Sequence, residues 1–194
     1  MRKLILQMQM SVDGFVGSDT IDDWQLWDWG DNNGWDAALK REFNRHLASL
    51  DTILLSRKMA EEGYLTHWGN AARRFPRDPF YAFAKRIVDA RKVVLTDKLK
   101  KSKWDRTVVR SGDLTREVTA LKKEKGKAIG VFGGAGFAAA LISARVVDEY
   151  HFYINPFVLG SGVRIFDETT FGGLKLLKAK AFKCGMVVGK YATR

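Results

Sequence analysis

The stretch AIGVFGGAGFAAALISAR, residues 128–145, places an apolar run directly before a glycine-rich turn and an alanine-rich segment. The run at 128–132 predicts a short buried strand, and the small side chains after it predict a helix that ends near Arg145. Four small residues join the two elements: Gly133, Gly134, Ala135 and Gly136. A strand followed by a glycine turn and a helix is typical of α/β proteins.

Outward from this unit, strands and helices alternate toward the N-terminus. Residues 3–10 alternate between apolar and polar side chains, which predicts a strand that is followed by a turn at 11–14. Apolar spacing predicts helices at about 36–50, 59–62, 80–88 and 114–125, and strands at 52–55, 92–96 and 107–110. We expect loops at 17–35 and around Pro76 and Pro79.

The C-terminal third changes character, because strands are predicted at 150–155, 174–183 and 186–192 with no helix between them. The last two are joined through Cys184 and Gly185, which indicates a hairpin. The chain has no linker-like stretch and no repeat. We therefore predict one domain over residues 1–194, a three-layer α/β fold whose mixed, mainly parallel sheet has an antiparallel C-terminal part.

Composition excludes several classes of protein. The 194 residues are 46% hydrophobic and 28% charged, which excludes an intrinsically disordered chain. The single cysteine, Cys184, excludes an intramolecular disulfide and a multi-cysteine zinc site, and we interpret it as structural. No run approaches the roughly 20 apolar residues that span a bilayer, and the N-terminus lacks a signal-peptide pattern. We expect a cytoplasmic protein without a membrane partner.

The chain is basic, with 33 Lys and Arg against 22 Asp and Glu and a formal net charge of +11. Such a charge attracts either nucleic acid or a small phosphorylated molecule. The basic residues are scattered, and the densest run, residues 122–127, falls at the end of a predicted helix, where cations suit the helix dipole. We expect no nucleic-acid partner.

Several familiar chemistries lack their residues. The histidines, His46, His67 and His151, are far apart along the chain, so we expect no metal site. No Gly-x-Ser-x-Gly nucleophile motif occurs, and Gly185–Lys190 is one residue too short for a Walker loop. These patterns exclude common hydrolase and nucleotide-triphosphatase motifs.

One arrangement of residues fits a phosphate. Gly133–Gly136 follows a predicted strand and opens a helix, whose free N–H groups can bind an anion that approaches the glycine backbone. Glycines also pack tight strand–helix turns, and the spacing does not match the Rossmann fingerprint. Two further strand ends carry polar groups: Ser56, Arg57 and Lys58, then Thr96, Asp97 and Lys98. Arg57 and Lys58 can alternatively be a solvated helix start.

Six motifs in order resemble one family: MSVDGFV (10–16), LLSRKM (54–59), VVLT (93–96), GGAG (133–136), VDEY (147–150) and PFVLGSG (156–162). Together they cover nearly the whole chain. They resemble the dihydrofolate reductase-like superfamily and, within it, the reductase half of the bifunctional riboflavin-biosynthesis deaminase-reductase. The resemblance implies a sheet of about eight strands, an NADPH-dependent reductase and a homodimer.

The resemblance also implies roles for individual residues. The cofactor-binding positions are Val12, Val16, Gly17, Ser56, Arg57, Lys58, Thr96, Asp97, Gly133, Gly134, Ala135 and Gly136. Leu159, Gly160 and Gly162 match the late loop on the substrate side. Two positions depart from the family pattern: Ser56 replaces a usual glycine, and Asp97 stands where Ser, Arg or Lys would better meet a phosphate.

The substrate side rests on an aromatic segment, residues 22–36. Trp24, Trp27 and Trp29 can stack on a heterocycle or simply pack. No dihydrofolate-type catalytic carboxylate aligns among the aspartates of this segment, Asp22, Asp23, Asp28, Asp31 and Asp36. Asp13 is the candidate catalytic group at the hydride-acceptor end, and its alternative is a plain Asp-Gly turn.

The leading hypothesis is a stand-alone NADPH-dependent reductase of a pyrimidine- or pterin-like substrate, similar to the 5-amino-6-(5-phosphoribosylamino)uracil reductase domain. Two alternatives are dihydrofolate reduction and a basic module that binds a dinucleotide or nucleic acid without turnover. We expect NADPH to be preferred over NADH, because the cations Arg57 and Lys58 outweigh the single carboxylate of Asp97.

Overall fold

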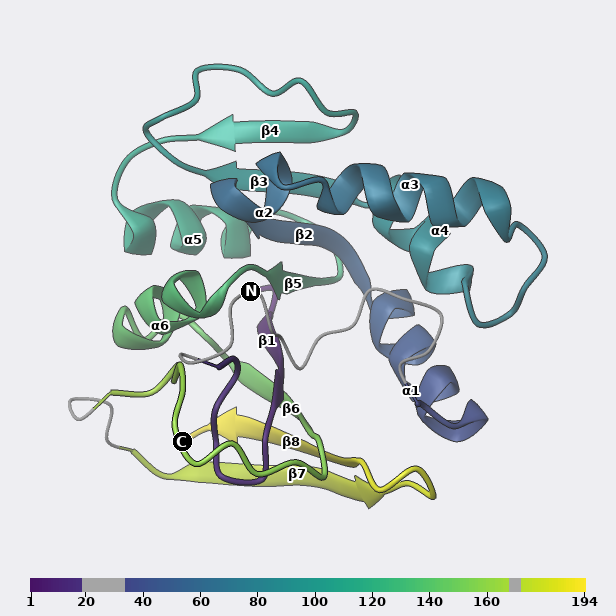
Figure 1. The fold of residues 1–194 in the computed structure, drawn as a ribbon. Coiled ribbons are helices and arrows are strands. Elements are labelled where there is room, and N and C mark those ends of the chain that lie inside the picture. Colours follow the sequence, from purple (N-terminus) through teal and green to yellow (C-terminus); the bar gives the residue numbers. More distant parts are fainter. Residues whose placement is uncertain (19–33, 168–171) are drawn as a thin grey trace.

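The computed structural model describes residues 1–18, 34–167 and 172–194. Strands and helices alternate along this part of the chain (Figure 1). The strands are β1 (Leu4–Met10), β2 (Leu50–Ser56), β3 (Arg91–Leu95), β4 (Thr107–Arg110), β5 (Ala128–Phe132), β6 (Glu149–Ile154), β7 (Leu174–Ala181) and β8 (Val187–Thr193). The helices are α1 (Ala37–Ala48), α2 (Arg57–Glu61), α3 (Tyr64–Arg74), α4 (Ala82–Asp89), α5 (Leu114–Lys123) and α6 (Ala135–Ser143).

All eight strands form one sheet in the order β4-β3-β2-β5-β1-β6-β8-β7. Strands β1 to β6 pair in parallel, whereas β8 pairs antiparallel with both β6 and β7. The hairpin from β7 to β8 turns at Gly185, whose φ is +87°. The predicted mixed sheet with an antiparallel C-terminal part is therefore confirmed.

Helices cover both faces of the sheet (Figure 1). On one face α1, α3 and α4 pack through Phe43, Tyr64 and Phe83. On the other face α5 and α6 pack through Leu121 and Leu141. Successive side chains of β1 point to opposite faces of the sheet. Ile5 packs with α1, α3 and α4, and Leu4 and Leu6 pack with α5 and α6. The three layers follow from this alternation.

One helix was missed by the sequence analysis. Helix α3 lies between the helix predicted at 59–62 and the loop predicted around Pro76, where no element is predicted, and it buries Tyr64, Trp68 and Ala71 at helical spacing. Gly63 ends one helix and begins the next in a left-handed conformation, with φ +99°. None of the helices in the described ranges is long and apolar enough to cross a membrane.

Ion pairs concentrate at the edge of the sheet where the parallel strands begin, which we call the amino edge. Arg2, with a side chain only 4% exposed, pairs with Asp51, and its guanidinium also donates to Thr52 Oγ1 at 2.7 Å and to the Lys127 carbonyl at 2.6 Å. Lys122 Nζ lies 2.7 Å from Asp148 Oδ2. The Arg2 contacts join the starts of β1, β2 and β5, and the Lys122 pair joins the end of α5 to the start of β6.

Candidate active site

The parallel strands β1, β2, β3, β5 and β6 end at one edge of the sheet, which we call the carboxyl edge. The segments that follow them lie there: residues 11–17, 56–58, 96–98, 133–136 and 156–163. Ligands of open α/β sheets bind outside the carboxyl ends of strands. Every predicted site residue in the described ranges lies in one of these segments.

The glycine segment at 133–136 contains two kinds of glycine. A Cβ on Gly133 would lie 2.6 Å from Phe137 Cδ1 and 3.2 Å from Ser56 Cβ, so this glycine permits close packing between the ends of β5 and β2. A Cβ on Gly134 or Gly136 would meet no atom within 4 Å. Gly134 is the N-cap of α6, and no described side chain caps this helix. Open space before uncapped N–H groups fits a pyrophosphate.

The segment after β2 begins the short helix α2. Ser56 is its N-cap, and its hydroxyl accepts a hydrogen bond from the Met59 N–H at 3.1 Å. Arg57 pairs with Glu61, and Lys58 Nζ lies 3.4 Å from Glu62 Oε1, one turn along the helix. The two predicted phosphate-binding cations thus each have a carboxylate partner in this structure. The spacing of four residues was visible in the sequence and was overlooked.

The segment after β3 holds Thr96 and Asp97. The Thr96 N–H donates to the Arg110 carbonyl at 2.9 Å, which continues the pairing of β3 with β4. Asp97 Oδ1 accepts a hydrogen bond from the Gly112 N–H at 3.0 Å. Asp97, which departs from the family pattern, therefore stabilises the turn after β4 through this hydrogen bond.

The turn after β1 and the loop after β6 form one unit. The Val12 N–H donates to the Phe157 carbonyl and the Val16 N–H to the Val163 carbonyl, each at 2.8 Å. Gly162 has φ +145°, and a Cβ there would lie 2.2 Å from the Gly17 carbonyl oxygen. Only glycine fits at this crossing, so Gly162 has a packing role between the two segments.

Asp13 connects the same two segments through its side chain. Its carboxylate accepts hydrogen bonds from the Gly160 N–H at 2.7 Å and the Leu159 N–H at 3.1 Å. The Ser11 hydroxyl and these backbone N–H groups lower the pKa of Asp13 to about 2. The side chain is therefore an anion at neutral pH, a hydrogen-bond acceptor and not a stored acid.

Other predicted residues lie elsewhere. Trp24, Trp27 and Trp29 are outside the described residues. Cys184 lies in the β7–β8 turn, where its N–H donates to Asp36 Oδ2 at 3.2 Å.

Two of the three histidines are neighbours in the fold although they are far apart along the chain. The rings of His46 and His151 are buried with centroids 4.8 Å apart. Helix α1 packs against the sheet and brings the two together, which separation along the chain could not reveal. Among the described residues, no three His, Cys, Asp or Glu side chains are arranged to hold a metal ion.

Comparison with known proteins places these features in a family. The chain is 27% identical to the uncharacterized protein YyaP of Bacillus subtilis (strain 168) over 188 residues, covering 96% of this chain and 92% of that protein. Its fold is similar to a putative riboflavin biosynthesis protein from Shewanella sp. PV-4, with a TM-score of 0.68, 15% identity and 99% of both chains covered.

The fold is also similar to dihydrofolate reductase from Enterococcus faecalis complexed with NADP(H), with a TM-score of 0.58, 14% identity and coverage of 99% of this chain and 96% of that chain. The family model of the RibD C-terminal domain matches residues 2–188. The order of motifs, the eight-stranded mixed sheet and this match agree. The chain belongs to the RibD C-terminal domain family, a family of oxidoreductases.

Proposed function

We propose that this protein is an NADPH-dependent reductase of a pyrimidine- or pterin-like heterocycle, in the manner of the 5-amino-6-(5-phosphoribosylamino)uracil reductase domain. The observation that carries the proposal is the open space at Gly134 and Gly136, in front of the uncapped N-terminus of α6. It lies beside the end of β2, where family members place the adenosine phosphate. The NADP(H)-bound dihydrofolate reductase has a similar fold, which supports the same cofactor.

The chain's own residues would bind and orient the cofactor. The backbone N–H groups of Gly134, Ala135 and Gly136 receive the pyrophosphate, and Arg57 and Lys58 receive the ribose phosphate. Both cations are exposed enough to exchange Glu61 and Glu62 for a phosphate, because exposed ion pairs contribute little energy. Val12, Val16 and Gly17 border the nicotinamide. Bound NADPH supplies the hydride, and orientation is the contribution of the protein.

Asp13 acts as a positioning residue in this proposal. Its carboxylate holds the N–H groups of Leu159 and Gly160, so the loop after β6 is held against the turn that borders the nicotinamide. With a pKa of about 2, it donates no proton at neutral pH. The proton that accompanies the hydride then comes from solvent. The tryptophans Trp24, Trp27 and Trp29 are proposed to stack on the heterocycle.

We also propose that the protein is cytoplasmic, binds neither nucleic acid nor membrane, and forms a homodimer. The outer strand β7 supports the dimer, because it is exposed on both faces and Leu176 and Leu177 are about half exposed. A Leu176→Glu variant should remain monomeric at concentrations where the native chain dimerises, as light scattering after gel filtration would show. A native chain that is monomeric at high concentration would contradict this proposal.

The cofactor proposal is tested by Gly134→Val. A Cβ at this position meets no protein atom within 4 Å, and a branched side chain takes the space that the pyrophosphate needs. NADPH affinity should therefore fall by about a hundredfold or more while the fold persists. Tryptophan fluorescence measures NADPH affinity, and thermal unfolding measures the fold. Gly69→Val in α3 is the matched control and should leave affinity unchanged.

Unchanged affinity in folded Gly134→Val would mean that the glycine segment is only a packing turn. Turnover is tested separately, by following NADPH absorbance with an aminopyrimidine ribityl or phosphoribosyl substrate and with dihydrofolate. Consumption with dihydrofolate alone would favour the alternative of dihydrofolate reduction. NADPH binding without turnover on either substrate would favour the non-catalytic dinucleotide-binding alternative.

A further inference from the structure

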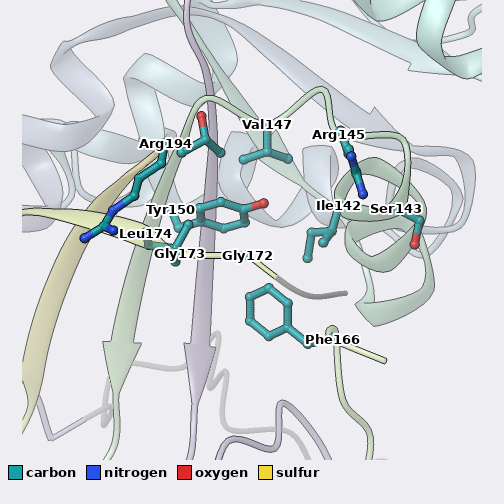
Figure 2. A pocket seen from close by; sticks show the side chains of 11 residues that line it. Ile142, Ser143, Arg145, Val147, Tyr150, Phe166, Gly172, Gly173, Leu174 and Arg194 are labelled. Atoms are coloured by element: carbon teal, nitrogen blue, oxygen red, sulfur yellow. The ribbon is translucent and has the colours of Figure 1, made fainter. Parts of the chain in front are cut away.

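A cavity of about 730 Å³ lies at the amino edge, away from the candidate active site. Its walls are the end of α6, the start of β6, the start of β7 and the end of β8 (Figure 2). The six residues of β6, at roughly 3.3 Å each, place it about 20 Å from the carboxyl edge. A ligand here would not overlap the glycine segment at 133–136.

The end of α6 places an arginine at this cavity in an unusual backbone conformation. The Val146 N–H donates to the Leu141 carbonyl and the Arg145 N–H to the Ile142 carbonyl, which is the Schellman pattern. Arg145 therefore occupies the left-handed position that favours glycine, with φ +54°. Glycine would adopt this conformation with less strain, so the local fold does not explain an arginine here.

The cations at the cavity lack the partners that other amino-edge cations have. Arg2 and Lys122 pair with Asp51 and Asp148, whereas Arg145 and Arg194 form no ion pair with any carboxylate in the described ranges. The Schellman bonds already occupy the last carbonyls of α6, so these do not compete for the Arg145 guanidinium. The cavity therefore has positive charge available for an anion.

Aromatic rings line the cavity between the two arginines. Figure 2 shows Tyr150 and Phe166 with Arg194 on one side and Arg145 on the other. The ring centroids of Tyr150 and Phe166 are 6.1 Å apart and the planes are tilted by 47°. Tyr150 stacks on Phe152 and is buried, so it adds a ring edge and its hydroxyl to the cavity wall, whereas the half-buried Phe166 adds more of its ring. Burial raises the pKa of Tyr150, so its hydroxyl remains a hydrogen-bond donor at neutral pH. Ile142 and Val147 add apolar surface.

We propose that this cavity binds a small aromatic anion, a planar ring system that carries a phosphate or a carboxylate. The ring lies against Tyr150 and Phe166, and the anionic group contacts the guanidinium of Arg145. The volume suits one or two fused rings with an anionic substituent, within the usual range of ligand sites. This second site does not depend on the proposed reductase function.

The test uses 1-naphthyl phosphate as the probe, with binding to the whole protein measured by calorimetry. Arg145→Gly removes the guanidinium and relieves the left-handed strain, so its thermal midpoint should equal or exceed that of the native protein. Loss of one charge-assisted contact should weaken probe binding about tenfold or more. Arg57→Ala, which removes a cation at the carboxyl edge, is the matched control and should leave the affinity for the probe unchanged.

Three further probes test the ligand class. Inorganic phosphate and 1-naphthol should each bind at least about tenfold more weakly than the probe, because each lacks one half of the recognised group. 1-Naphthoate replaces the phosphate with a carboxylate. Tighter binding than that of 1-naphthyl phosphate would indicate a carboxylate site, and weaker binding would indicate a phosphate site. The proposal is overturned if the native protein does not bind the probe, if Arg145→Gly binds it with native affinity, or if only Arg57→Ala weakens binding.

Discussion

The two edges of the sheet use their polar groups differently. At the amino edge, Arg2 and Lys122 are buried and pair with Asp51 and Asp148, which are distant from them in sequence. At the carboxyl edge, Arg57 and Lys58 pair only within their own helix turn, and Gly134 faces open space. Removing one member of a buried pair is costly because it leaves the other charge without its partner, whereas exposed local pairs contribute little and can be exchanged. The difference assigns stability to one edge and ligand binding to the other.

The largest effect on stability is expected for Arg2→Ala. The change removes the cation that pairs with Asp51 and the donor to the Thr52 hydroxyl, and it opens space between the starts of β1, β2 and β5. Asp51 keeps the hydrogen bonds from the Lys127 N–H and the Thr52 hydroxyl. We expect a loss of about 3 kcal/mol in the free energy of unfolding. Chemical denaturation measures it. At denaturant concentrations below the unfolding transition, NADPH affinity should be unchanged. A loss of affinity together with the loss of stability would contradict the separate roles of the two edges.

Acid should also destabilise the amino edge, through the buried histidine pair. Burial lowers the pKa of His151 to about 4 and that of His46 well below its usual value, with Lys190 adding to the effect on both. The native state therefore keeps both rings neutral while the unfolded chain binds protons below pH 6.5, so stability falls as the pH decreases. Between pH 6.5 and 5, His151 alone should remove about 1.6 kcal/mol.

Denaturation midpoints across this pH range measure the effect. Glu149 Oε2 lies 3.3 Å from His151 Nε2, and Glu42 acts on His151 through its charge. Burial raises the pKa of each carboxyl group, but the hydrogen bonds from Lys190 to Glu42 and from Lys3 to Glu149 outweigh it, so both pKa values are lowered and these groups titrate at lower pH. A His151→Gln variant should show a smaller slope between pH 6.5 and 5. An equal slope in the variant would show that other groups control acid stability.

Arg57→Ala removes an arginine at the carboxyl edge, and we expect it to change cofactor binding and leave stability nearly unchanged. The preference for NADPH over NADH should shrink about tenfold, or roughly 1.4 kcal/mol. Stability should change by less than about 0.5 kcal/mol, because the Glu61 pair is exposed and local. Titrations with both cofactors measure the preference. Glu61→Gln should increase it by freeing Arg57, and equal affinity for the two cofactors in the native protein would refute the assigned phosphate site.

The smallest effect is expected at Asp97. Removing its charge should increase the NADPH preference by about fivefold at most, since an exposed repulsion is worth about 1 kcal/mol or less. Asp97→Ser shortens the side chain as well, whereas Asp97→Asn keeps an oxygen for the Gly112 N–H. The two variants should increase the preference equally if charge is the cause. An increase in Asp97→Ser alone would indicate movement of the turn instead.

Local patterns predicted most of the fold. The alternation in residues 3–10 and the small residues at 133–136 identified β1 and the β5–α6 turn, and the resemblance placed both in the correct family. Helix α3 was missed although Tyr64, Trp68 and Ala71 have helical spacing. The helix predicted at 59–62 ends before Gly63, but one glycine in a left-handed conformation can both end a helix and precede another.

The sequence by itself determined which segments are strands or helices, because spacings of two and of three to four residues depend only on neighbours along the chain. It also determined the glycine turn and its position at a strand end. Only the tertiary structure decided that Gly134 faces open space while Gly162 is pressed against Gly17, that Asp13 holds Leu159 and Gly160, and that His46 meets His151. Such contacts depend on strand register and helix packing, which bring together residues with no local relation in sequence.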